Sequence, residues 1–303
     1  MTGAPSGYLH GDYARSLGDF GQPRLLSRAQ GWLLARAIPA TSQCDAIGCY
    51  PLFCCSDWTG LSADLAELQD LVSASLVADP FGNHDVRLLR ECFPDVMIPF
   101  KHHFVADLSR DPSEFVAKHH QRNARYALDH VEMERCVVPT DHAMAWSELY
   151  DNLIRRHSIE GIAAFSPLAL RSQLAIPGIE MFRAVIGAQT VGAVLWMVQN
   201  QIAYYHLAAY SEAGYDAKAS FGLFWTSLHY FSGKGVRWLS FGGGPSVREG
   251  EDNGLVRFKR GWSTGTRMAY FCGRILNPAA YASLAKSRSA TNFFPAYRQH
   301  ERE

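Results

Sequence analysis

The stretch DAKASFGLFWTSLHYF, from Asp216 to Phe231, carries large apolar residues at three- and four-residue spacing. This spacing places them on one face of a helix. We expect the helix to end at Gly233 and Gly235, because glycine suits the turn that follows a helix C-terminus. The next residues, VRWLSF from Val236 to Phe241, form a short apolar run that predicts a buried strand.

Three successive glycines, at positions 242–244, follow this strand. Glycine lets the backbone turn sharply or approach another group closely, so a functional turn is expected here. A polar loop from Pro245 to Gly254 then leads to FKRGW, from Phe258 to Trp262. In this last motif two cations lie between large aromatic residues, which makes it a candidate for chemistry.

The residues before this stretch predict a meander. Apolar runs at 181–186, 190–198 and 202–209 are separated by short polar turns, and such runs form antiparallel strands. A last strand with alternating character is expected over 267–274. Helices followed by a meander, a helix and further strands indicate an α+β fold with mixed strand pairing.

Helix signals occur in both halves of the chain. In the sequence DPSE, Asp111 caps a helix, Pro112 takes its first position and Glu114 follows as a carboxylate in the first turn. The helices expected from such signals run from 62 to 72, 86 to 92, 111 to about 128 and 141 to 156, with another starting at Ser166. A hairpin is expected over 25–38, with strands at 75–77 and 97–107.

The chain of 303 residues is long enough for two ordinary domains. We expect a domain over residues 1–105 and a second one over residues 106–303. The 29 basic and 29 acidic residues of the full chain balance, so no overall electrostatic field attracts nucleic acid or an anionic membrane. No apolar run reaches the roughly 20 residues that cross a bilayer. Met1 to Tyr8 does not read as a secretory signal, and we expect a cytoplasmic protein.

Neither cysteines nor histidines predict a metal site. Seven cysteines occur without a C-x-x-C pair, which indicates structural thiols in a reducing compartment. The pairs His102-His103 and His119-His120 are adjacent, and adjacent side chains do not converge on one ion in a strand or helix. H-E-x-x-H is absent as well, so we expect neither a metal nor a disulfide.

The second half of the sequence resembles the C-terminal half of Fem-type proteins. These are members of the GNAT acyltransferase superfamily that add amino acids to peptidoglycan peptides. The matching stretches are YHLAA at 205–209, the helix from Lys218, FGGG at 241–244 and GLVRFKRGW at 254–262. The family writes the last one roughly as G-L-x-x-F-K-x-G-F, the most specific part of the match. The chain is equally similar to the BioF2-like acetyltransferase group.

The resemblance covers most of the chain and implies an architecture. Two GNAT-like domains would follow in tandem, each a mixed central sheet flanked by helices. The N-terminal one, residues 1–105, would be degenerate, and residues 106–303 would form the GNAT domain that carries the transfer site. The long coiled-coil arm of many Fem enzymes is not expected, because the sequence has no sustained heptads.

The resemblance also implies site residues. In Fem proteins a Phe-Lys pair lies where the donor ester meets the acceptor amine, which assigns catalysis to Phe258 and Lys259. A fixed cation stabilises the oxyanion of the tetrahedral state in acyl transfer. A surface lysine between packing aromatics is the alternative interpretation, and a satisfied core histidine is the alternative for His206. The residues assigned to the acceptor cleft are Tyr205, His206, Gly243, Gly244 and Trp262.

Donor binding is expected near the start of the helix at Lys218. GNAT enzymes hold the pyrophosphate of coenzyme A on backbone N–H groups at this point. Here the preceding loop lacks the usual glycines and contains Asp216, which counts against coenzyme A. Lys218 and Ser220 could still hold a phosphate, and Arg122 and Arg125, one helical turn apart, could grip one bidentately. An ordinary capped helix and a solvated basic face explain the same residues.

These features predict an N-acyltransferase that forms an amide bond and has no tightly bound cofactor. Aminoacyl-tRNA is preferred as co-substrate over acyl-CoA, so that the tRNA acceptor end would be one partner. The other would be an amine-bearing cell-wall precursor, polysaccharide or small metabolite. A non-catalytic binding protein with the same fold is the alternative of a different class. The carboxylates that could take the acceptor proton are Asp107, Glu160, Asp216 and Glu249.

Overall fold

The computed structural model describes residues 4–244, 254–285 and 293–302. By its internal contacts the chain forms two compact units. The larger unit comprises Met1–His10 and Lys101–Arg267, and the smaller one comprises Gly11–Phe100 and Met268–Glu303. The chain passes between the units inside two long strands, β5 (Val96–Asp107) and β11 (Gly265–Ile275).

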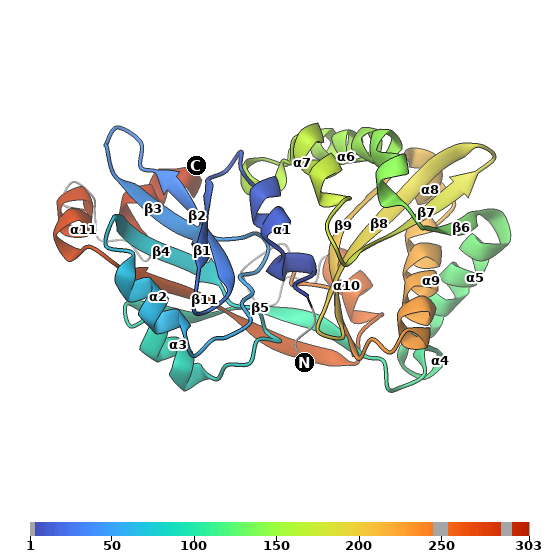
Figure 1. Ribbon diagram of the computed structural model, residues 1–303. Coiled ribbons are helices and arrows are strands. Elements are labelled where there is room, and N and C mark those ends of the chain that lie inside the picture. The colour runs from blue at the N-terminus through green and yellow to red at the C-terminus, as the bar shows by residue number, and fades with distance from the viewer. Residues whose placement is uncertain (1–3, 245–253, 286–292, 303) are drawn as a thin grey trace. The chain divides into compact units, whose positions relative to one another are not determined.

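A mixed sheet runs through the middle of the larger unit, with helices on both sides (Figure 1). Strands β7, β8 and β9 are the antiparallel meander predicted from the sequence. Strand β10 pairs with β9 in parallel and with β5 in antiparallel orientation. The strands lie in the order β5, β10 (Trp238–Ser240), β9 (Ile202–Tyr210), β8 (Gln189–Gln199), β7 (Ile179–Ile186) and β6 (Glu132–Cys136).

Helix α9 (Ala219–Gly233) is the helix predicted from the apolar spacing, and it packs against β7 and β8. Helix α5 (Lys118–His130) crosses it at Gly222, where a Cβ would lie 2.3 Å from Met133 and 3.1 Å from Ala127. Glycine is therefore needed there for close packing. The other helical segments are η1 (Gly7–Leu9), α4 (Pro112–Phe115), η2 (Pro139–His142), α6 (Ala143–His157), η3 (Gly161–Ala163), α7 (Pro167–Gln173), α8 (Glu212–Asp216) and α10 (Gly254–Arg260).

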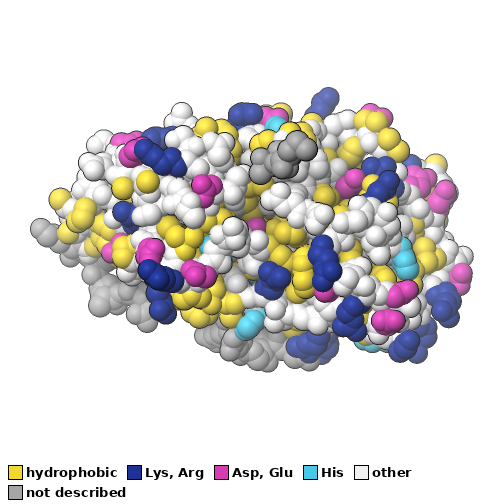
Figure 2. Space-filling view, turned by 60° about the horizontal axis from the view of Figure 1, so that its bottom comes forward, with side chains coloured by type: hydrophobic (Ala, Val, Ile, Leu, Met, Phe, Trp, Pro, Cys, Tyr) yellow, Lys and Arg dark blue, Asp and Glu magenta, His cyan; other side chains and the backbone are white. Residues whose placement is uncertain are grey.

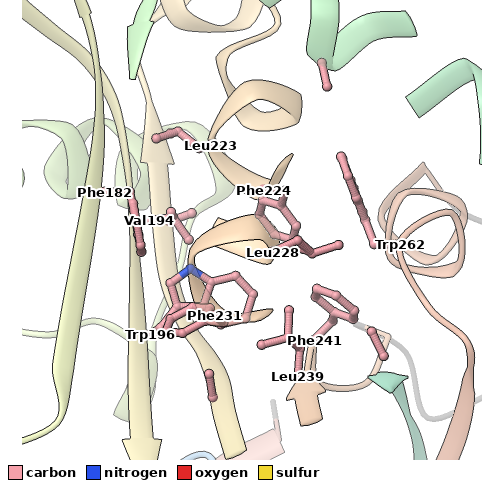
Figure 3. Packing of buried hydrophobic residues seen from close by; sticks show 14 of the residues in the cluster. Phe182, Val194, Trp196, Leu223, Phe224, Leu228, Phe231, Leu239, Phe241 and Trp262 are labelled. Atoms are coloured by element: carbon pink, nitrogen blue, oxygen red, sulfur yellow. The ribbon is translucent and has the colours of Figure 1, made fainter. Parts of the chain in front are cut away.

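The core of the larger unit is aromatic. Figure 3 shows the side chains of α9 between those of the sheet and Trp262. The ring of Phe224 lies 5.7 Å from Trp196 of β8 and 5.6 Å from Trp262. The indole N–H of Trp196 donates to the Ser227 hydroxyl at 3.1 Å, so this buried polar group is satisfied.

The smaller unit has its own sheet and core. The predicted hairpin is confirmed as β1 (Gln22–Leu26) and β2 (Gly31–Ala37). Around it lie β3 (Cys44–Gly48), β4 (Leu71–Val77) and β11, with helices α1 (Gly11–Ser16), α2 (Leu61–Glu67), α3 (Val86–Cys92), α11 (Pro278–Ala285) and η4 (Ala296–Arg302). The buried residues at the centre include Leu33, Phe53, Trp58, Leu65 and Leu76.

A buried ion pair ties the C-terminal segment into the smaller unit. Asp45 of β3 is 1% exposed and Arg298 is 5% exposed. The Arg298 guanidinium donates to both carboxylate oxygens, at 2.5 and 2.9 Å, and to the Ala37 carbonyl at 2.8 Å. The Tyr297 hydroxyl donates to the same carboxylate at 3.1 Å. The carboxylate of Asp45 thus pairs with a residue more than 250 positions away in the chain, and also with Arg36 of β2 at 3.4 Å.

Two expectations about local structure were wrong. The helix predicted from Asp111 to Leu128 is two helices, because Val116 is extended and the Ala117 N–H donates to the Gly261 carbonyl at 2.9 Å. Leu71 and Val72 do not continue α2 but begin β4, where strand pairing buries them. For the FKRGW motif the sequence predicted no secondary structure, and the structure places its first three residues in helix α10.

The predicted domains, 1–105 and 106–303, differ in their limits from the two compact units. Residues 268–303 belong to the smaller unit, because β11 pairs with β4 and α11 packs on it. That residues 1–105 are a degenerate GNAT-like copy stays a prediction. Within the described ranges, the helices are too short or too polar to cross a bilayer.

Candidate active site

Lys259 lies on the last turn of α10, and only 7% of its surface is exposed. Its ammonium donates to the Gly243 carbonyl at 2.6 Å. The same Nζ lies 5.7 Å from the centre of the Tyr205 ring, a distance at which a cation is attracted to an aromatic face. The lysine, the glycine turn and one predicted acceptor-cleft residue, Tyr205, therefore meet at one place.

The surroundings of Lys259 disfavour its charged form. Burial, and then the positive charge of Lys101, lower the pKa of Lys259 to about 7. Among the described residues no carboxylate forms an ion pair with it. A buried amine with a pKa near neutrality and a cation beside it is typical of functional sites.

Lys101 and His103 of β5 complete this cluster, and sequence reasoning missed them as site residues. Burial, followed by the charges of Lys259 and Lys101, lowers the pKa of His103 to about 3, so its ring is neutral. Its Nδ1 is buried and has no hydrogen-bond partner among the described residues. Burial also lowers the pKa of Lys101. The only sequence feature that could have indicated them as a pair is their spacing of two residues, which places both side chains on one face of a strand.

Strand pairing brings β5 to the glycine turn. The Phe241 N–H donates to the Phe104 carbonyl at 2.9 Å, and the Phe104 N–H donates to the Gly242 carbonyl at 3.1 Å. Gly242 has a φ of +73°, which favours glycine. A Cβ on Gly243 would lie 3.0 Å from the Lys101 side chain, so glycine lets that lysine approach.

Gly244 lies next to α10, since a Cβ there would be 2.9 Å from Val256. Phe258 is half-buried and packs against Phe221 and Phe224, with ring centres 5.2 and 4.9 Å apart. Trp262, predicted for the acceptor cleft, is fully buried in the core of the larger unit. Its position is that of a packing residue. The sequence could not show this, because apolar spacing alone does not distinguish the wall of a cleft from a core.

Tyr205 and His206 of β9 contact different helices, Tyr205 contacting α9 and His206 contacting α7. The Tyr205 ring contacts Phe224 of α9. His206 is 7% exposed, and both of its ring nitrogens are hydrogen-bonded: Nε2 to the Gln173 side chain and Nδ1 to the Tyr8 hydroxyl, each at 3.1 Å. Burial lowers the pKa of His206 to about 3. The structure therefore supports the core interpretation of His206.

The predicted donor residues lie around α5 and the first turn of α9. The Lys218 ammonium donates to the Asn123 side chain at 3.1 Å and lies 4.7 Å from the centre of the Tyr126 ring. Both partners belong to α5, so Lys218 joins the two helices. Ser220 is half-buried on the first turn of α9, and Arg122 and Arg125 are exposed on α5.

A pocket of about 540 Å³ opens between the start of α5, the first turn of α9 and α10. Its apolar wall includes Phe221 and Phe258, while Arg257 and Arg260 bring positive charge. It is thus suited to a ligand with an apolar part and an anionic part. On the face shown in Figure 2, by contrast, basic and acidic side chains are interspersed, without a broad cationic area.

The candidate general bases that the structure describes do not contact Lys259. Asp107 accepts from the Arg237 guanidinium at 2.9 Å and from Ser109 at 2.8 Å. Glu160 and Asp216 are exposed. Glu249, with the polar loop predicted after Pro245, lies outside the described residues. Among the residues that the structure describes, no group of three or more His, Cys, Asp or Glu could hold a metal ion.

Residues 116–260 match the family model described as acetyltransferase (GNAT) domain. The match includes Tyr205, the glycine turn and Lys259, whereas Lys101 and His103 precede it. A comparison with curated proteins finds no match to this sequence.

Solved structures share the fold. The chain is similar to FemX, with a TM-score of 0.66 and 15% identity over 90% of this chain and 92% of that one. It is similar to the C-terminal domain of a putative lysylphosphatidylglycerol synthetase from Agrobacterium fabrum, with a TM-score of 0.62 and 14% identity over 91% and 89%. For L-PGS from Bacillus licheniformis the TM-score is 0.58 and the identity 12%, over 91% and 94%. Residues 116–260 therefore form a GNAT acetyltransferase domain, within a chain that shares the fold of FemX.

Proposed function

We propose that this protein transfers an acyl group from an activated ester or thioester to an amine, with Lys259 as the catalytic cation. The observation that carries the proposal is the buried Lys259 ammonium, held by the Gly243 carbonyl at 2.6 Å beside Lys101. Such a site has an excess of positive charge and stabilises an anion that forms next to it. The oxyanion of an acyl transfer is such an anion.

The reaction needs no covalent enzyme intermediate. The neutral amine attacks the carbonyl carbon of the donor, and a C–N bond forms while the carbonyl oxygen becomes an oxyanion beside Lys259. The C–O or C–S bond to the carrier then breaks, and the carbonyl is restored as an amide. The proton lost by the amine passes to the leaving hydroxyl or thiol, so no oxidant, reductant or metal is required.

For the donor we propose aminoacyl-tRNA. The turn before α9 supports this choice, because helix α8 with the exposed Asp216 takes the position where GNAT enzymes usually have a glycine-rich pyrophosphate loop. Arg257 and Arg260 at the pocket rim can contact the few phosphates of an acceptor end. Each phosphate contact contributes roughly 0.7–0.9 to the salt slope of binding, so a weak and salt-sensitive complex is expected.

The donor assignment is tested by an acylation assay with charged tRNA and an amine acceptor, with and without ribonuclease. We expect amide formation that ribonuclease abolishes and that falls steeply as salt rises. The matched variant pair is Arg257→Gln and Lys234→Gln, of which only the first removes a cation from the pocket. Activity that survives ribonuclease would contradict the tRNA donor.

Acyl-CoA is the second candidate donor. The match of residues 116–260 to an acetyltransferase domain favours it, and the mostly apolar pocket can also hold a phosphopantetheine arm. Ribonuclease-resistant turnover that requires an acyl-CoA would replace the first donor by this one. The proposed role of Lys259 is the same for both donors, since both pass through an oxyanion.

Turnover is expected to depend on pH through Lys259. Lys259 acts as a cation, so kcat should fall as pH rises through its pKa of about 7. The positive charge of Lys101 lowers this pKa, and therefore Lys101→Met should raise it and move the falling limb to higher pH. The measurement is kcat from pH 5.5 to 9, with Lys234→Met as control. A limb that stays in place in Lys101→Met would contradict the coupling.

A further inference from the structure

The side chain of His120 joins α5 to α10. It is 2% exposed, and its Nε2 lies 3.0 Å from the Phe258 carbonyl oxygen. A carbonyl only accepts, so Nε2 carries the proton and donates it. Burial, and then the neighbouring His119, lower the pKa of His120 to about 4, so the ring is neutral at physiological pH.

This contact completes the hydrogen bonding at the end of α10. The last carbonyls of a helix lack partners within the helix. Here the Arg257, Lys259 and Arg260 carbonyls accept from backbone N–H groups of residues 261–263. The Phe258 carbonyl accepts from His120. The C-terminus of α10 is therefore held by a side chain that comes from another helix.

The imidazole has little room to move. A Cβ on Gly261 would lie 2.2 to 2.6 Å from three of its ring atoms, so only glycine fits there. The ring centres of Trp262 and Phe221 lie 4.9 and 5.1 Å away. The Ala117 N–H, just before α5, donates to the Gly261 carbonyl at 2.9 Å. A shift of His120 thus requires a shift of α10.

We propose that His120 is a positioning residue that keeps Lys259 at the transfer site by holding the peptide carbonyl that directly precedes it. The Phe258 carbonyl belongs to the peptide bond that leads into Lys259, so its position sets the position of the Lys259 backbone. The Lys259 ammonium in turn makes its 2.6 Å bond to Gly243 from that backbone. The inference rests on the proposed catalytic role of Lys259.

The first test compares His120→Met with His120→Gln. The two side chains have the same length and similar helix propensity, but only glutamine can donate to the Phe258 carbonyl. We expect His120→Met to lower kcat roughly 10- to 100-fold, the effect of a displacement on the order of 1 Å, with little change in the acceptor KM. His120→Gln should restore most of the loss. Equal kcat values in the two variants would overturn the proposal.

The second test does not depend on activity. Labelling by acetic anhydride across pH, followed by peptide mass spectrometry, gives the titration of Lys259 in each variant. Among the described residues, the groups that face Lys259 are Lys101, His103, Tyr205 and the Gly243 carbonyl, and none is altered. We expect the midpoint of Lys259, about 7 in the native chain, to rise in His120→Met and to stay near 7 in His120→Gln. Lys234 serves as the internal control, with an unchanged profile.

The two tests separate the inference from the proposed function. If Lys259→Met retains turnover while His120→Met still shifts the Lys259 titration, the catalytic role fails and the positioning role holds. If the Lys259 profile is the same in His120→Met and His120→Gln, the positioning role is overturned. Should His120→Met fail to fold, His120→Asn carries the same expectations, because its shorter amide does not reach the Phe258 carbonyl.

Discussion

Replacement of Lys259 by methionine is expected to lower kcat by about 10²- to 10³-fold, the loss of one group that stabilises an oxyanion. The same replacement should raise the free energy of unfolding at pH 7 by about 1–3 kcal/mol, because it removes a buried cation that has no carboxylate partner among the described residues. Part of the gain is offset by the lost hydrogen bond to Gly243, worth about 1 kcal/mol.

The stability gained in Lys259→Met is expected to depend on pH. The pKa of Lys259 is lowered from 10.5 in an exposed lysine to about 7 in the folded chain. Below pH 7 both states carry the proton, and folding bears the full cost of the buried charge. Between pH 7 and 10.5 the unfolded chain binds more protons, so native stability rises with pH. The advantage of Lys259→Met should therefore be greatest at or below pH 7 and should shrink toward pH 10.

Chemical denaturation at several pH values, together with kcat, checks both parts. Lys234→Met is the matched control, and neither its kcat nor its stability should change with this pattern. If Lys259 only packs between aromatic residues, its replacement by methionine should leave kcat unchanged. A variant with native kcat and intact fold would therefore remove Lys259 from the mechanism.

Asp45→Ala is expected to destabilise the smaller unit by about 3–5 kcal/mol. The substitution leaves the Arg298 guanidinium, 5% exposed, without its carboxylate, and the Tyr297 hydroxyl loses an acceptor. An uncompensated buried charge is the reason for the large effect. Hydrogen exchange of β3 and β4, followed by mass spectrometry, should show faster exchange in these strands.

The control for Asp45→Ala is Asp70→Ala. Asp70 also pairs with an arginine, Arg24, at 2.9 Å, but its side chain is 57% exposed. Exposed pairs contribute at most about 1 kcal/mol, so this variant should be near neutral. The double variant Asp45→Leu/Arg298→Met should recover part of the loss, because it also removes the buried charge of Arg298. Arg36, which lies 3.4 Å from the Asp45 carboxylate, is unchanged in both variants. Equal effects of Asp45→Ala and Asp70→Ala would contradict the account of the buried pair.

Local sequence patterns were sufficient to predict much of the secondary structure of the larger unit. The meander over β7, β8 and β9 follows from apolar runs separated by short turns, and α7 begins at Ser166-Pro167, whose hydroxyl caps it. Helix α9 follows from the spacing of Phe224, Leu228 and Phe231. These signals depend on residues a few positions apart, so they are present in the sequence alone.

The surroundings of Lys259 were not predictable in the same way. The sequence by itself determined the motif with Phe258 and Lys259 and the glycine turn before it, since both are local. Only the tertiary structure decided that β5 pairs beside that turn, which brings Lys101 and His103 to a lysine more than 150 positions later. It also decided that Trp262 and His206 are buried, and that His120 meets Phe258. The physical reason is that strand pairing and side-chain burial join residues far apart in the chain, and these contacts set both the geometry and the charge of the site.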